Sequence, residues 1–190
     1  ILELIHIANG NIDNKTFEDD LSGNETVKVL KATQSIVQRI NSTHPGSLGL
    51  HPLIYFYSAD GRYKPASFLI TTLLVKKLQS SPKKLNEFTK VREILEKWLI
   101  GHDYFAEQIV RKSRSASVGY PIVAELYEKV IKMINTVGLS PTQVTERLES
   151  LEDYGYITKP VPKLSQEKDD FSGPMKSAVF IGAALAQALK

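Results

Sequence analysis

The sequence predicts a mainly α-helical chain, with about seven helices in a single domain. Apolar residues recur every three or four positions over most of its length, a spacing that gives a helix one apolar face. Prolines and glycines separate these stretches, as they do where helices begin and end. Only residues 53–63 differ. They are aromatic and β-branched around the turn pair Asp60 and Gly61, and predict at most one short β-hairpin.

In the first half of the chain, helices are predicted over residues 1–8, from about residue 24 until the break at residues 44–46, and over residues 66–78. The first stops at Gly10, part of a strong turn signal. Pro65 precedes the third helix, at a position where a first helical turn tolerates proline.

The second half predicts four more helices and one prominent loop. Apolar stripes indicate helices over residues 85–100, 104–110 and 121–137, and another beginning at Pro141. The basic, serine-rich run 111–119 is predicted to be a flexible loop.

The domain organisation follows from these elements. Residues 1–157 are expected to form the helical domain, residues 158–171 a linker, and residues 172–190 a C-terminal helix. Because this last pattern stops without a capping residue, we expect the chain to be a fragment whose final helix leads towards a further module.

Residues 138–157 are similar to the last helix and first wing strand of winged-helix proteins. As a DNA-reading helix this segment is unfavourable, because its helix carries four acidic side chains against one arginine. A packed structural helix is the favoured interpretation, and a winged helix that serves protein contacts stays open.

Composition and missing motifs narrow the function. The chain has no cysteine, so a disulfide framework, a cysteine-ligated zinc site and a cysteine nucleophile are excluded. No apolar run approaches the ~18–20 residues of a membrane span, and we expect a cytoplasmic protein without a membrane partner. None of the four histidines pairs with another at helical metal-site spacing. Phosphate-loop, dinucleotide-binding and nucleophile-elbow motifs are absent as well, so we expect no catalytic residue, metal or cofactor.

Positive charge is concentrated in the middle of the chain. Residues 61–132 carry 14 basic and 7 acidic side chains, whereas residues 1–60 and 133–190 have net charges of −3 and −1. Such a region suits the DNA backbone, since cations and hydroxyls in a loop are what phosphate contacts require. A solvated basic face is the other interpretation. The candidate DNA-binding residues are Arg111, Lys112, Arg114, Lys76, Lys77, Lys83 and Lys84.

Three segments carry a resemblance to a known family. Residues 47–68 (SLGLHPLIYFYSADGRYKPASF), residues 102–112 (HDYFAEQIVRK) and residues 171–185 (FSGPMKSAVFIGAAL) resemble bacterial proteins with a ParB-like N-terminal domain and a C-terminal HNH endonuclease domain. The resemblance implies that this chain is the connector between the two modules, in a restriction or phage-defence protein. Neither module's motifs occur here, so nuclease activity does not transfer. The expected role is to position DNA or to couple the flanking domains of the same polypeptide.

Two other functions remain open. The first is a protein–protein scaffold that forms a homodimer or docks a partner, for which four tyrosines would supply exposed aromatic surface. These are Tyr55, Tyr57, Tyr63 and Tyr120. The second is a free-standing winged-helix regulator, which the acidic helix disfavours.

Overall fold

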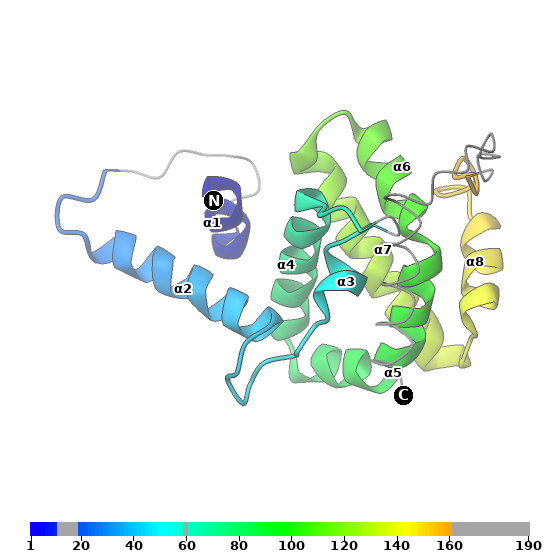
Figure 1. The fold of residues 1–190 in the computed structure, drawn as a ribbon, viewed down its shortest axis with the longest axis horizontal. Helices are drawn as coiled ribbons and strands as arrows, with labels where there is room; N and C mark the ends of the chain where they lie inside the picture. The colour runs from blue at the N-terminus through cyan, green and yellow to red at the C-terminus, as the bar shows by residue number, and fades with distance from the viewer. Residues whose placement is uncertain (11–18, 59–60, 161–190) are drawn as a thin grey trace, which may run out of the picture.

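The computed structural model describes residues 1–10, 19–58 and 61–160, which form one mainly α-helical domain (Figure 1). The described residues form eight helices: α1 (Leu2–Asn9), α2 (Asn24–Ile40), α3 (Pro52–Tyr55), α4 (Pro65–Gln79), α5 (Pro82–Gly101), α6 (Asp103–Ser113), α7 (Ala116–Val137) and α8 (Pro141–Glu149). The predicted fold class is therefore confirmed. The helix expected over residues 172–190, and residues 161–171 of the expected linker, lie outside the described residues.

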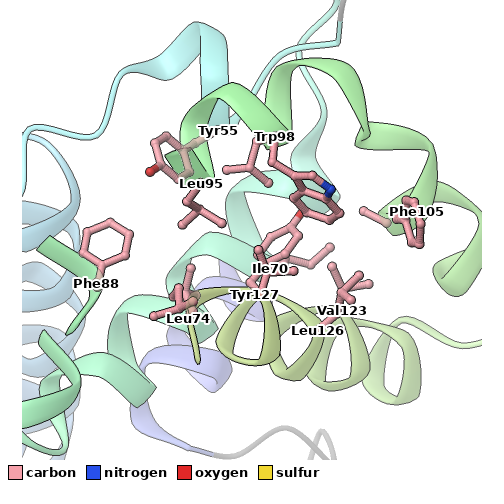
Figure 2. Packing of buried hydrophobic residues seen from close by; sticks show 14 of the residues in the cluster. Tyr55, Ile70, Leu74, Phe88, Leu95, Trp98, Phe105, Val123, Leu126 and Tyr127 are labelled. Atoms are coloured by element: carbon pink, nitrogen blue, oxygen red, sulfur yellow. The ribbon is translucent and has the colours of Figure 1, made fainter. Parts of the chain in front are cut away.

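Helix α7 is the centre of the domain and packs against α4, α5 and α6. Its buried residues Val123, Leu126, Val130 and Ile134 recur at helical spacing, as the apolar stripe predicts. Figure 2 shows Val123 and Leu126 facing side chains from α4, α5 and α6, with the fully buried Trp98 among them. One continuous apolar core thus joins most of the helices.

Helices α1 and α2 lie to one side of this core, on the left in Figure 1, while α8 lies at the opposite end. Asn9 ties α1 to α2, since its amide Nδ2 donates to the carbonyl of Val29 and to the hydroxyl of Thr33, both at 3.2 Å. Lys76 of α4 donates its ammonium to the carbonyl of Ala8 at 2.9 Å. Because that ammonium is partly buried, the pKa of Lys76 is lowered from its ordinary value.

The predicted hairpin at residues 53–63 is reduced to a single antiparallel bridge between Tyr57 and Tyr63. Leu53 belongs instead to the one-turn helix α3. Pro52 accounts for the difference, because its fixed backbone angle favours a helical turn immediately after the extended His51.

A buried polar network fixes α3 to α5. The Tyr55 hydroxyl donates to Glu96 Oε1 at 3.0 Å, and the same oxygen accepts from Arg92 Nε at 2.6 Å. Arg92 also donates to the carbonyls of Leu48 and Gly49, at 2.5 and 2.9 Å. Burial, and then the negative charge of Glu96, raises the pKa of Tyr55 well above its ordinary value.

The prediction of a loop over residues 111–119 is wrong. Helix α6 continues to Ser113 and α7 already begins at Ala116, so only two residues connect them. Pro121 therefore lies inside α7 rather than at its start. At the sixth position of α7 it lies just beyond the first turn, and it removes the N–H that would otherwise donate to the carbonyl of Ser117.

Helix α8 is a packed structural element. The hydroxyl of Ser140 accepts from the backbone of Gln143, whose side chain accepts in return from the backbone of Ser140, a complete capping box. Val144 and Leu148 are fully buried. Residues 151–156 form turns and bends, so the winged-helix-like segment 138–157 has no wing strand there.

Candidate nucleic-acid interface

Three predicted DNA-binding residues meet at the junction of α6 and α7. We call residues 111–115 the α6–α7 corner. Arg111, Lys112 and Arg114 are all exposed there, and none forms an ion pair with an acidic side chain in the described parts of the chain. The corner is sharp because Arg114 adopts the left-handed conformation, with φ 56°. Two of the cations, Arg111 and Lys112, thus lie on the last turn of α6, and Arg114 lies on the tight turn that follows it.

The start of α7 adds hydrogen-bond donors to the corner. Ser115 is the N-cap of α7, yet its hydroxyl lies 2.8 Å from that of Ser117 and does not cap the helix. The first backbone N–H groups of a helix lack internal partners and carry the positive end of the helix dipole. An anion is therefore favoured at this end of α7.

Lys112 has an aromatic neighbour from the segment that follows α8. Its ammonium lies 3.4 Å from the centre of the Tyr156 ring, in a cation–π contact. Unlike an ion pair, this contact does not neutralise the positive charge of Lys112. The segment after α8 is fixed beside α6 by Gln108, which exchanges two hydrogen bonds with the backbone of Thr158, at 2.7 and 3.1 Å.

The remaining candidates, Lys76, Lys77, Lys83 and Lys84, are here called the α4–α5 lysines. Lys77 and Lys84 both reach Glu128 of α7, at 3.4 and 2.7 Å. Lys83 lies 3.9 Å from Glu87. Since Lys76 is bonded to the end of α1, each of the four has an intramolecular partner. The structure therefore separates these lysines from the corner, although the sequence grouped them.

A cavity of about 450 Å³ opens beside the corner, between the Tyr57–Tyr63 bridge and helices α4 and α6. We call it the tyrosine pocket. The rings of Tyr57 and Tyr63 meet edge to face, with centres 5.7 Å apart, and Tyr63 is 51% exposed. Arg111 lines the same cavity, so it belongs to both the pocket and the corner.

Charged side chains in the pocket are paired across two segments. Lys64 donates to Asp103 Oδ2 at 2.8 Å and to Glu107 Oε1. Burial alone would lower the pKa of Lys64, but these hydrogen bonds outweigh it and the pKa is raised. Lys64 is therefore a stable cation that holds the strand-like segment against α6.

The described part of the chain holds no candidate metal cluster. Residues 1–10, 19–58 and 61–160 contain no cluster of three His, Asp or Glu side chains suited to a metal ion. His102 packs its ring against Trp98 and contacts the carbonyl of the same residue at 2.8 Å, at the end of α5. In the same ranges, none of the helices combines the length and apolar character that a membrane crossing requires.

The tyrosine pocket was not predicted from the sequence. Tyr57 and Tyr63 were singled out as aromatic surface, but Asp103 and Glu107, which line the same pocket and bind Lys64, are about 40 positions further along the chain. Tyr55, grouped with them, is buried. A signal existed in the spacing of Asp103, Glu107 and Arg111, which places three charges on one helical face.

Comparison with known proteins gives no relative. No protein-family model, no curated protein and no solved structure matches this chain.

Proposed function

We propose that this chain is a non-catalytic helical domain that holds the phosphate backbone of DNA at the α6–α7 corner. The observation that carries the proposal is the set of three exposed cations, Arg111, Lys112 and Arg114, at the open N-terminus of α7. Backbone amides at a helix start, together with arginine and lysine, are the usual ligands of phosphate oxygens. Such contacts do not read sequence, so the domain positions DNA without selecting a site.

The resemblance to ParB-like and HNH proteins suggests a role for a DNA contact at the α6–α7 corner. A domain between two such modules would keep DNA beside the nuclease, or couple the modules when DNA is bound. The parent protein would then act in restriction or phage defence, in the cytoplasm.

Duplex binding measured by fluorescence anisotropy over a salt series tests the proposal. Each phosphate contact contributes about −0.9 to the slope of log affinity against log salt, so the slope of the unaltered domain is expected to be roughly −3. Charge reversal at Arg111, Lys112 and Arg114 should remove most of that slope and lower the affinity by at least about tenfold at low salt.

A matched variant controls for net charge. Reversal of Lys31, Lys90 and Lys97 changes the net charge by the same amount on exposed positions of α2 and α5. That variant should keep most of the affinity and the slope. Equal behaviour of the two triple variants would rule out the corner as the DNA contact.

A second candidate function, homodimer formation, is supported by an exposed apolar stripe on α2. Val27, Leu30 and Val37 are 50%, 50% and 36% exposed on the outer side of α2, and with Gln34 they follow the heptad spacing of a coiled-coil seam. This stripe supports the alternative of a homodimer that pairs α2 with its copy. Light scattering should then give twice the monomer mass, and Leu30→Lys should restore the monomer.

A further inference from the structure

The tyrosine pocket has the size and lining of a ligand site. Its volume of about 450 Å³ falls within the range of roughly 300–1,000 Å³ that small-molecule sites occupy. Apolar side chains such as Ile54, Pro65 and Val110 form much of the wall, and a few charged groups converge on it. This combination suits a flat, partly polar ring better than a phosphate or a metal ion.

The tyrosines supply a stacking surface. Tyr57 and Tyr63 already meet edge to face, and the backbone bridge between them fixes their relative position. The half-exposed ring of Tyr63 leaves aromatic surface open to a ligand. Every nucleobase has a π-face, and stacking on tyrosine is a common way of holding an unstacked base.

The carboxylates supply hydrogen-bond acceptors. Lys64 bonds to Oδ2 of Asp103 and to Oε1 of Glu107, one oxygen of each. A carboxylate accepts through both oxygens, and the hydrogen bonds between described residues leave the second oxygen of each to another donor. An amine on a heteroaromatic ring is such a donor.

Arg111 connects this pocket to the backbone contact. Asp103, Glu107 and Arg111 follow one another at four-residue spacing on α6, so they form a stripe that runs from the pocket to the corner. A strand whose phosphates lie on the corner would carry its bases past the mouth of the pocket.

The geometry points to the tyrosine pocket as a site for one unstacked nucleobase with an exocyclic amine, taken from a strand whose phosphates lie on the α6–α7 corner. Tyr63 stacks on the base, Asp103 and Glu107 accept from its amine, and Arg111 contacts the adjoining phosphate. This assignment rests on the proposed DNA contact and adds to it a preference for exposed bases, as in single-stranded or distorted DNA.

Two single strands of equal length test the assignment, one of adenine nucleotides and one of abasic sugars. They carry the same phosphates, so only the pocket distinguishes them. The unaltered domain should bind the adenine strand roughly five- to 150-fold more tightly by anisotropy, the range that stacking of one base supports. A thymine strand, whose base has no exocyclic amine, should fall between the two.

Variants of the pocket then separate it from the corner. Tyr63→Ala should abolish most of the preference for adenine over abasic strands, and Tyr63→Phe should keep it, because the ring remains. Neither should change the salt slope on the abasic strand. Reversal of Lys112 and Arg114 should instead reduce the slope and leave the adenine preference in place. Melting curves of each variant confirm that it is folded.

The outcomes distinguish the two proposals. Equal affinity of the unaltered domain for both strands, with a normal salt slope, overturns the base pocket and leaves the DNA contact standing. A slope near zero on every strand overturns the DNA contact. Displacement of the adenine strand by micromolar AMP would assign the pocket to a free nucleotide and overturn its assignment to a strand.

Discussion

The α4–α5 lysines and the α6–α7 corner are both rich in basic residues, but they differ in what surrounds those residues. Lys77 and Lys84 share Glu128, whose side chain is only 16% exposed. Their positive charge is therefore partly balanced by this carboxylate within the fold. At the corner, Arg111 and Arg114 have no such carboxylate in the described part of the chain. A net charge read from the sequence therefore overstates the charge available to a partner.

Helix α5 repeats this comparison within one element. Arg92 and Glu96 pair at four-residue spacing, and Glu93 and Lys97 pair at the same spacing. The Glu96 side chain is 8% exposed, whereas that of Glu93 is 69% exposed. The two pairs therefore differ mainly in burial, which decides what each contributes to stability.

The largest predicted effect is the loss of stability when the buried Arg92–Glu96 pair is broken. Glu96→Ala should lower the free energy of unfolding by about 3–5 kcal/mol, because Arg92 loses its carboxylate and the Tyr55 hydroxyl loses its acceptor. Urea denaturation monitored through Trp98 measures the change. Glu93→Ala is the control on the same helix and should leave the urea midpoint nearly unchanged, because water and salt screen an exposed pair. Equal losses in the two variants would mean that burial does not separate these pairs.

The next effect concerns the close approach of α6 and α7. A Cβ atom at Gly119 would lie 3.1 Å from the Val110 Cα, so Gly119→Ala should destabilise the domain by about 1–3 kcal/mol. Gly101 has open space, and Gly101→Ala should stabilise by about 0.5–1 kcal/mol through its helix propensity. Thermal melting of both variants gives the comparison. A stabilised Gly119 variant would contradict the tight packing behind the corner.

A smaller effect is expected for the carboxylate shared by Lys77 and Lys84. Burial raises the pKa of Glu128, but the hydrogen bond from Lys84 and the charges of both lysines outweigh it, and the pKa lies below its ordinary value of 4.5. A lowered pKa stabilises the fold above the ordinary value and stops doing so as the pH falls through the lowered one. Glu128→Gln should thus cost about 0.5–1 kcal/mol at neutral pH and progressively less below about pH 4.5. A cost that stays constant with pH would exclude this ion pair as its source.

The smallest predicted effect is a substitution that raises the stability of the domain and weakens its binding to DNA. Arg114 occupies the left-handed region, where a side chain costs about 1 kcal/mol and glycine is favoured. Arg114→Gly should raise stability by about 0.5–1 kcal/mol and weaken duplex binding. Arg114→Ala should weaken binding to the same extent without the gain in stability. Tighter binding by the glycine variant would show that the arginine charge is not used.

The helices were predictable because their signals are local. Apolar spacing and the positions of Pro65, Gly138 and Pro141 place α4, the end of α7 and the start of α8 to within a few residues. The short connection between α6 and α7 was not predictable. Residues 111–119 have a loop-like composition, yet most of them extend the two helices that bury Ile109 and Val123. Packing of the neighbouring turns overrides the weak propensity of serine and glycine.

The candidate site was half predictable for the same reason. Arg111, Lys112 and Arg114 are adjacent in the chain, so their cluster is visible in the sequence. The tyrosine pocket joins Tyr63 and Lys64 to Asp103, and such a long-range pairing is set by how α4 and α6 pack on α7.

Composition and periodicity are properties of the chain, and they are enough to establish that this protein is mainly helical, that its middle is basic and that it has no cysteine chemistry. Which cations have partners depends instead on how the helices pack. Whether Lys84 or Arg111 is available to a phosphate depends on where a carboxylate from another helix lies, and Glu128 reaches Lys84 because α5 and α7 pack side by side.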